Sequence, residues 1–329
     1  MGFEEENPVQ VRKNIKIEND LMISKVNGKR YEIGKLQIVS PEELKTEVKP
    51  LKFYGSKIKV SAIVGDVQEL HKMPGNKGAL FQVASQFNLL EMTGPEITPE
   101  AGVGIYEYDH TQGPACAIAC GAGTIYRNYF VDVNGQLGQS AENQIDCLSR
   151  FGKALGNDVH NFWRMSNGYV LSTEENLVKM NKVLDSLTEE EYELLKGKVE
   201  VGIQWNTEVT VSEDKNIVSQ IYCSALPVSY SDVEANLWEK FARLILEATY
   251  EATFYAALKN YERNGNSKLF LTLVGGGAFG NKKEWIYDAI GSAVEKFSTV
   301  PLDVKIVTRR EPSVTLTQFI ENTNRKLGG

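Results

Sequence analysis

The feature that most constrains the fold is the stretch "LFLTLVGGGAFGNKKEWIYDAIGSAVEKF" at residues 269–297. Its first six residues are apolar without interruption, as expected of a strand that is buried on both faces of a sheet. Apolar residues then recur at helical spacing over 283–297, which predicts an amphipathic helix. A buried strand followed closely by a helix is typical of α/β proteins, so this segment predicts an α/β fold.

The turn between this strand and helix contains Gly275, Gly276, Gly277 and Gly280. Glycines let the backbone adopt positive φ and come close to a ligand, and a helix N-terminus offers free N–H groups. We therefore expect a phosphate or pyrophosphate site here. Two alternatives stay open. The glycines could only make a tight turn, or they could be a G-x-G-x-x-G dinucleotide fingerprint with Arg309 and Arg310 beyond it, as in an NADP-dependent oxidoreductase.

Strand and helix patterns alternate through the rest of the chain. Strands are predicted within 57–67, 113–131, 169–172, 199–210, 217–231 and 302–307. Helices are predicted at 79–92, 141–155, 173–198 and 231–265. Residues 1–56 contain a hairpin pattern around Asn27-Gly28, which predicts an N-terminal β extension packed on the main domain. We expect one elaborated α/β domain with a mixed sheet between helices.

Composition and charge exclude several classes of function. The net charge of −7 and the pI of about 5.3 argue against broad nucleic-acid binding. The N-terminus has no apolar signal segment, and the chain has no apolar run of about 18 residues, so we expect a cytoplasmic protein without a membrane span. Four cysteines without CxxC pairing predict free thiols, and three scattered histidines predict no metal site. No cofactor is expected.

Three ordered motifs resemble those of macrodomains. The stretch "VSAIVGDV" resembles their early strand, "NKGALFQVASQFN" their first ligand loop, and "LTLVGGGAFGN" their pyrophosphate-binding loop. The last motif is most similar to the poly(ADP-ribose) glycohydrolase branch. The resemblance implies a three-layer α/β/α domain over 57–329, with a mixed central sheet and a helical insertion at about 135–200. It also implies an ADP-ribose or related nucleotide ligand, with ADP-ribosylated protein as a further partner.

The resemblance implies a role for each residue that matches these motifs. Asp66 would bind adenine, Val67 would offer its backbone N–H, and Gln86 would match a glutamine of the family signature. The distal ribose would lie against Asn76, Lys77, Gly78 and Ala79. The pyrophosphate would lie in the loop of Gly275, Gly276, Gly277, Ala278, Phe279, Gly280 and Asn281, where Phe279 would stack near the distal ribose.

The paired glutamates of the glycohydrolase signature are absent from this sequence, because Phe87 and Asn88 stand in their places. An amide cannot donate a proton as an acid does. The catalytic candidates are therefore Asn88, Glu91 and Asp109, with Arg127 as a further partner for a pyrophosphate or substrate. The expected function is ADP-ribose binding, with hydrolysis of an ADP-ribosyl bond as the enzymatic form. The alternative is a non-catalytic reader of ADP-ribosylation or of a nucleotide signal.

Overall fold

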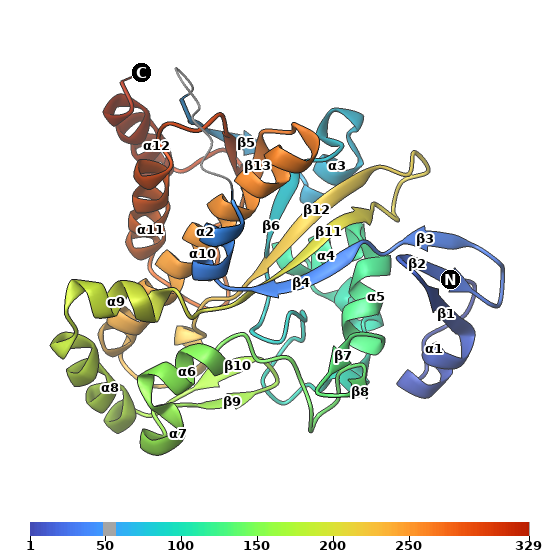
Figure 1. Ribbon diagram of the computed structural model, residues 1–329, viewed down its shortest axis with the longest axis horizontal. Helices are drawn as coiled ribbons and strands as arrows, with labels where there is room; N and C mark the ends of the chain where they lie inside the picture. The colour runs from blue at the N-terminus through green and yellow to red at the C-terminus, as the bar shows by residue number, and fades with distance from the viewer. Residues whose placement is uncertain (49–56, 329) are drawn as a thin grey trace.

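A seven-stranded mixed sheet forms the centre of the molecule (Figure 1). The computed structural model describes residues 1–48 and 57–328. The strands lie in the order β4-β11-β12-β6-β13-β14-β5. Their bounds are β4 Lys35–Val39, β5 Lys59–Val64, β6 Leu80–Ala84, β11 Val201–Glu208, β12 Ile217–Cys223, β13 Lys268–Leu271 and β14 Asp303–Thr308.

Five neighbouring strands of this sheet, from β12 across to β5, run parallel to one another. Strand β11 runs antiparallel to both of its neighbours, β12 and the edge strand β4. The carboxyl ends of the five parallel strands therefore lie at one edge, where ligands bind in open α/β sheets. The first parallel strand along the chain, β5, lies at the end of the order rather than in its centre. This order differs from the dinucleotide-binding arrangement, so it does not support the NADP alternative.

Helices cover both faces of the sheet, which gives three layers. One face carries α2 (Pro41–Glu47), α10 (Ala235–Asn264), α11 (Lys283–Lys296) and α12 (Val314–Lys326), and the other carries α3 (Val67–Lys72), α4 (Gln112–Ala119) and α5 (Gly121–Tyr129). Adjacent side chains of β6 point to opposite faces of the sheet and contact helices of different layers. Gln82 donates a hydrogen bond to Thr253 on α10, whereas Phe81 stacks on His71 of α3. The predicted α/β fold with a mixed central sheet is confirmed.

The long helix α10 begins at Ala235 and ends where Gly265 adopts a φ of +75°. Gly265 ends it as the sequence predicts, because a left-handed cap favours glycine. Most of its side chains are buried between the sheet and the outer helices. Within residues 1–48 and 57–328, no helix combines the length and the apolar character that a membrane crossing needs.

Two predicted elements are wrong. The segment predicted as a helix over 79–92 contains the central strand β6 and then an irregular loop. The segment 113–131, predicted to contain a strand, forms the helices α4 and α5, which meet at Cys120. Gln82 explains the first error, because a polar residue inside a doubly buried strand resembles the polar face of a helix.

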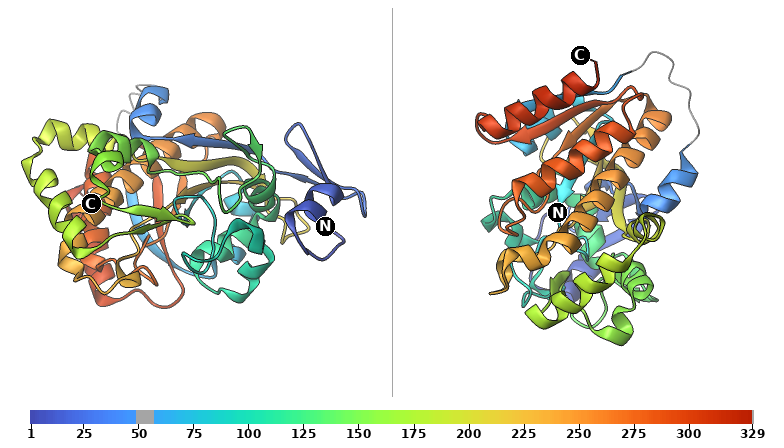
Figure 2. Two further views of the ribbon diagram at one scale, coloured as in Figure 1. Left: turned by 90° about the horizontal axis from the view of Figure 1, so that it is seen from below. Right: turned by 90° about the vertical axis from the view of Figure 1, so that its left-hand side faces the viewer.

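The N-terminal residues form a small sheet that projects from one end of the molecule (Figure 2). Its strands are β1 (Ile15–Glu18), β2 (Leu21–Ser24) and β3 (Arg30–Glu32), and the helix α1 (Pro8–Asn14) precedes them. The hairpin predicted around Asn27-Gly28 joins β2 to β3. The next strand, β4, pairs with β11 and so becomes an edge of the central sheet. The end of the predicted extension, residues 49–56, lies outside the described residues, and the division of the chain at residue 57 stays a prediction.

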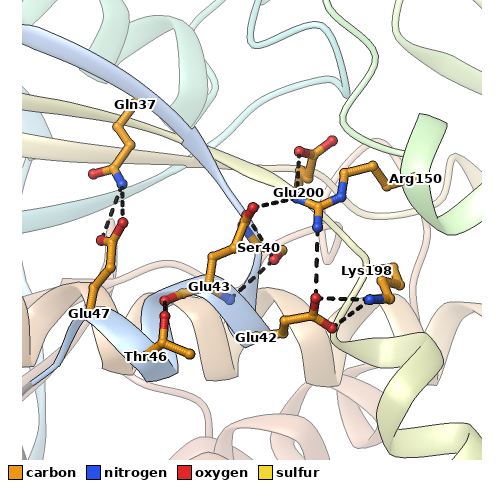
Figure 3. A network of polar contacts seen from close by, with 9 residues as sticks. All are labelled: Gln37, Ser40, Glu42, Glu43, Thr46, Glu47, Arg150, Lys198 and Glu200. Atoms are coloured by element: carbon orange, nitrogen blue, oxygen red, sulfur yellow. Dashed lines mark hydrogen bonds and ion pairs between the residues drawn. The ribbon is translucent and has the colours of Figure 1, made fainter.

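The predicted insertion near 135–200 lies between α5 and β11. It contains β7 (Asp132–Val133), β8 (Gln136–Leu137), α6 (Ser149–Leu155), α7 (Asn157–His160), β9 (Arg164–Ser166), β10 (Tyr169–Leu171), α8 (Glu174–Ser186) and α9 (Glu189–Lys196). Arg150 on α6 contacts Glu43 of α2 at 2.7 Å, and Lys198 contacts Glu42 at 2.7 Å (Figure 3). These ion pairs attach the insertion to the N-terminal part of the chain.

Candidate ligand and active site

A cavity of about 200 Å³ opens at the carboxyl ends of β6, β12 and β13. Its lining comes from the loops that follow these strands, from the start of α4 and from β10 of the insertion. A larger hollow of about 1010 Å³ lies between α11 and α12, but the charged side chains that line it are exposed. The smaller cavity is the candidate site, because it includes a buried ionisable group.

The glycine loop after β13 is closed on itself by its own backbone. Asn281 donates its N–H to the Gly275 carbonyl at 2.9 Å, and its side chain donates to the Leu226 carbonyl at 2.8 Å. Gly275 and Gly280 have φ of +76° and +71°. A Cβ at Gly280 would lie 1.7 Å from the Ser229 hydroxyl oxygen, so glycine is required there by packing as well as by conformation.

The same loop lines the cavity with residues whose N–H groups are unpaired in the described chain. Gly275, Gly277, Ala278 and Phe279 line it, and within the described chain none of their N–H groups donates a hydrogen bond. A Cβ built on Gly277 would have no atom of the described residues within 4 Å, and the φ of Gly277 is not positive. Packing therefore does not require glycine at 277. A run of unpaired N–H groups around an open space is a typical anion site.

Gly276 and the start of α11 do not contribute to this cradle. Gly276 donates its N–H to the Leu273 carbonyl at 2.9 Å and is outside the cavity lining. Lys282 and Lys283 at the start of α11 are exposed and also outside that lining. The loop itself, rather than the helix N-terminus that the sequence indicates, offers the donors.

The loop after β6 holds Glu91 against the cavity. Gln86 donates its N–H to the Leu90 carbonyl at 3.0 Å, and its side chain accepts from the Met92 N–H at 2.8 Å. Leu89, with φ +64°, turns the chain between them. The Glu91 N–H donates to the Tyr106 hydroxyl at 3.0 Å. These bonds fix the backbone on both sides of the Glu91 carboxyl.

The Glu91 side chain is 3% exposed, yet it contributes to the cavity lining. Its Oε1 is buried and has no hydrogen-bond partner in the described chain. Burial raises the pKa of the Glu91 carboxyl well above its usual range, Arg127 opposes that rise, and Asp109 adds to it. Glu91 therefore stays protonated well above the pH at which an exposed glutamate ionises, which is the state of a general acid.

Gly113, at the start of α4, makes room for this carboxyl. A Cβ at Gly113 would lie 2.4 Å from Glu91 Oε2 and 2.0 Å from the Ala84 carbonyl oxygen. The neighbouring Gln112 side chain joins α4 to β6, because it donates to the Gln82 carbonyl and accepts the Ala84 N–H. The helix and the strand thus approach closely on either side of the acid.

Asp109 supplies a second carboxyl group to the cavity lining. It follows the short helix η3 (Gly104–Tyr108), and its Oδ1 accepts the Thr111 N–H at 2.8 Å. Asp109 is only half-buried, whereas Glu91 is almost fully buried. Two carboxyl groups in different environments at one cavity can serve as an acid and a charged or basic group.

Three aromatic rings form one wall of the cavity. Tyr169 lies 5.4 Å from Phe279 and 5.3 Å from Tyr230 between ring centroids, and Tyr230 lies 5.5 Å from Phe279. The Tyr169 hydroxyl donates to the Met92 carbonyl at 2.6 Å. Tyr169 comes from β10, so the insertion completes the site.

The predicted adenine and distal-ribose residues lie elsewhere. Asp66 accepts the N–H groups of Gln68 and Glu69 as the cap of α3, and neither it nor Val67 lines the cavity. The Asn76–Ala79 segment precedes β6, whereas the glycine loop follows the parallel strand β13. These two segments are therefore at opposite edges of the sheet, and the expectation that they converge is corrected.

Two further expected positions need correction. Asn88 is buried and outside the cavity lining, with its side chain bonded to Gln144 and to the Leu90 N–H. Arg127 is 1% exposed and also outside the lining, so it is not placed to touch a pyrophosphate. Of the predicted residues, the cavity brings together Gln86, Glu91, Asp109, Gly275, Gly277, Ala278 and Phe279.

Sequence reasoning missed Tyr169, Tyr230 and Gly113. Tyr169 belongs to the insertion, which the family motifs do not cover, and its contact with the cavity depends on tertiary packing. Gly113 precedes Pro114, a pair that marks the first turn of a helix and so offered a local signal.

Metal and thiol chemistry find no support in the described residues. They contain no group of three or more ligand side chains that could hold a metal ion. Cys116, Cys120, Cys147 and Cys223 are free and buried, and burial raises the pKa of each thiol. Raised thiol pKa values disfavour the thiolate, which is the reactive form.

The comparisons with known proteins give structural matches alone. No protein-family model matches the chain, and no curated protein matches it. The structure is similar to poly(ADP-ribose) glycohydrolase from Thermomonospora curvata, at 10% identity over 96% of each chain, with a TM-score of 0.48. It is also similar to the Deinococcus radiodurans enzyme in complex with ADP-ribose, at 10% identity over 89% of this chain and 94% of the other, with a TM-score of 0.48.

A third match is the Thermomonospora curvata enzyme bound to the inhibitor ADP-HPD. It is 10% identical over 97% of this chain and 96% of the other, with a TM-score of 0.46.

Proposed function

We propose that this protein binds ADP-ribose, or a closely related nucleotide diphosphate, and hydrolyses an ADP-ribosyl bond. The observation that carries the proposal is a single cavity that combines unpaired N–H groups with a buried carboxyl. Gly277, Ala278 and Phe279 present the N–H groups, and Glu91 presents the acid. The N–H groups suit the binding of a diphosphate, and the Glu91 carboxyl group suits protonation of a leaving oxygen.

In this proposal Glu91 donates its proton to the oxygen that leaves the anomeric carbon. The carbon–oxygen bond breaks with its electron pair on that oxygen, and a water oxygen attacks the anomeric carbon. The proton released by the water restores the Glu91 carboxyl. Asp109, half-buried in the cavity lining, stabilises the positive charge that develops on the sugar.

The aromatic wall supports the same ligand class. Tyr169, Tyr230 and Phe279 present ring surface next to the N–H cradle. A ribose packs its apolar carbon face on such rings while its diphosphate reaches the loop. The cavity of about 200 Å³ holds this part of the ligand, so the adenosine would extend beyond it.

The second candidate is a non-catalytic reader of ADP-ribosylation or of a nucleotide signal. The observation that favours it is the structural role of Asn88, which lies where the glycohydrolase signature has an acid. Binding without turnover of poly(ADP-ribose), ADP-ribosylated protein and small ADP-ribosyl esters would establish the reader.

Calorimetric titration with ADP-ribose tests binding, with NADP and ATP as competing ligands. We expect ADP-ribose to bind more tightly than either, and no binding at millimolar ADP-ribose would refute the proposal. Turnover is then compared between the wild type and Glu91→Gln. The matched control is Glu107→Gln, which changes an exposed carboxylate on η3. We expect Glu91→Gln to lose turnover and Glu107→Gln to retain it.

The remaining parts of the proposal concern partners and location. We infer a cytoplasmic enzyme whose partner is ADP-ribosylated protein and which does not bind nucleic acid broadly. The net charge of −7 and the four free, buried cysteines support this inference. Fractionation of cells, with immunodetection of the untagged protein, tests the location.

A further inference from the structure

Behind the Glu91 loop lies a buried arginine that has no ionic partner among residues 1–48 and 57–328. Arg127 is on α5 and is 1% exposed. Its Nε donates to the Leu89 carbonyl at 3.2 Å, and its Nη2 donates to the Thr124 hydroxyl at 3.1 Å. Its guanidinium carbon lies 3.6 Å from the centre of the Tyr222 ring. In the described chain its Nη1 has no hydrogen-bond partner, although buried donors are normally paired.

The unpaired acceptor that complements this donor belongs to the same loop. Glu91 lies two residues after Leu89, the residue whose carbonyl Arg127 already holds. Its Oε1 is buried and has no hydrogen-bond partner in the part of the chain that the structure describes, and the positive charge of Arg127 acts on its carboxyl group. Yet the described residues show no ion pair between the two within 4 Å. A neutral carboxyl explains this separation, because it does not attract the guanidinium as a carboxylate does.

We propose that Arg127 is a positioning residue that forms an ion pair with Glu91 only after Glu91 has given up its proton. This inference rests on the proposed hydrolysis. When the proton moves to the leaving oxygen, the Glu91 carboxylate gains a charge-assisted hydrogen bond from Arg127 Nη1. When a water proton returns to Glu91, the ion pair opens. Arg127 therefore stabilises the conjugate base without touching the substrate.

Tyr222, the ring over which Arg127 lies, begins a chain of hydrogen bonds that ends at His71. The Tyr222 hydroxyl donates to Gln220 Oε1, and Gln220 Nε2 donates to the Cys116 carbonyl and to His71 Nε2. His71 Nδ1 donates to the Val67 carbonyl, which fixes its neutral tautomer. Burial lowers the pKa of His71 to about 4, so this chain adds no second positive charge at neutral pH.

Several other groups lie near Glu91 and interact with its carboxyl group. The titratable and charged groups around it, from every element packed against it, are Tyr106, Asp109, Cys116, Arg127, Tyr169 and Tyr222. Arg127 is the cation of this set. Removal of Arg127 should therefore raise the midpoint of the Glu91 titration, which loss of a neutral tyrosine or thiol would not do.

The experiment measures the Glu91 titration by infrared difference spectroscopy of the protonated carboxyl, with Glu91→Gln to assign the band. In Arg127→Met we expect the midpoint to rise by about one pH unit or more, the size of effect that a nearby opposite charge has. Arg127→Lys should retain most of the wild-type midpoint. The matched control is Thr124→Val, which removes a hydrogen bond from Arg127 but leaves its charge.

Steady-state kinetics give an independent readout. We expect Arg127→Met to lower kcat at least tenfold with little change in KM, because Arg127 acts after the substrate has bound. An unchanged Glu91 midpoint in folded Arg127→Met would overturn the inference. If the Glu91 midpoint depends on Arg127 but the protein neither binds nor cleaves any ADP-ribosyl compound, the ion pair is supported and the proposed function is refuted.

If Arg127→Met does not fold, the wild type still tests the inference. Nuclear magnetic resonance of ¹⁵N-labelled arginine should show the Arg127 Nη signals changing at the pH where Glu91 titrates. The change should be absent in Glu91→Gln. Arg127 signals that stay constant through the Glu91 titration would overturn the proposed ion pair.

Discussion

Replacement of Gly277 by alanine separates the binding role of the glycine loop from its folding role. A Cβ at Gly277 would have no atom within 4 Å in the described part of the chain, so the fold can accept it. A glycine-to-alanine change at a compatible position stabilises a protein by about 0.4–1 kcal/mol, because it restricts the unfolded chain. We therefore expect the Tm of Gly277→Ala to be unchanged or slightly raised.

Ligand binding should change in the opposite direction. Gly277, Ala278 and Phe279 each present an N–H group without a partner in the described chain. A hydrogen bond to a charged group contributes about 1.5–3 kcal/mol, so moving a diphosphate away from two donors costs about 3 kcal/mol. This corresponds to a Kd for ADP-ribose that is weaker by on the order of 100-fold.

Calorimetry and thermal unfolding of the same preparations test both expectations. The control is Gly280→Ala, which places a Cβ 1.7 Å from the Ser229 hydroxyl oxygen at a φ of +71°. It should lower the Tm. An unchanged Kd in Gly277→Ala, with the fold intact, would refute the role of this loop as an anion cradle.

Three further predictions concern stability and the aromatic wall. Glu91→Gln should be more stable than the wild type near pH 7. The reason is that the Glu91 carboxyl keeps its proton in the folded wild type but releases it above about pH 4.5 in the unfolded chain, which favours unfolding. In denaturant titrations, the stability difference between the two proteins should shrink as the pH falls toward 4.5. Protonation of His71 should destabilise the fold as the pH falls from 6.5 to 4, because burial lowers the pKa of His71 to about 4; the expected loss of unfolding free energy is about 3 kcal/mol. In the same titrations, His71→Gln should lose less stability than the wild type over this pH range. A steeper acid limb in His71→Gln would contradict this assignment. Tyr169→Ala should weaken ADP-ribose binding about tenfold by calorimetry, whereas Tyr108→Ala, at a ring that is 78% exposed, should not.

Local sequence patterns predicted much of the fold, because apolar residues recur with a strong periodicity in the strands and helices of the C-terminal half. The apolar run before Gly275 forms β13, and the helical spacing after it forms α11. Gly265 ends α10 in the left-handed conformation that only glycine adopts easily. In each case the residues that specify the element lie within the element or directly beside it.

The failures occur where tertiary contacts determine the structure. Gln82 is compatible with the central strand only because it donates to Thr253 of α10 and accepts the Thr272 N–H. Residues 113–131 were predicted to contain a strand because they combine apolar residues with a glycine turn. The structure uses the small Gly113 and Gly123 to bring two helices close to the sheet.

The sequence predicted only part of the candidate site, again because local patterns are visible in a sequence and tertiary contacts are not. The glycine loop and Glu91 lie close to motif residues, so sequence order led to them. The other half of the predicted ligand site rested on Asn76 and its neighbours, and the direction of β6 places these at the opposite edge of the sheet. The contribution of Tyr169 depends on how the insertion folds back, which no local pattern encodes.

A crystal structure of Glu91→Gln with ADP-ribose would show whether the glycine loop and the acid bind one ligand. We expect diphosphate oxygens within hydrogen-bond distance of the N–H groups of Gly277, Ala278 and Phe279, with the distal ribose beside residue 91. A diphosphate bound away from this loop, or a ribose that leaves residue 91 out of reach of the anomeric carbon, would contradict it.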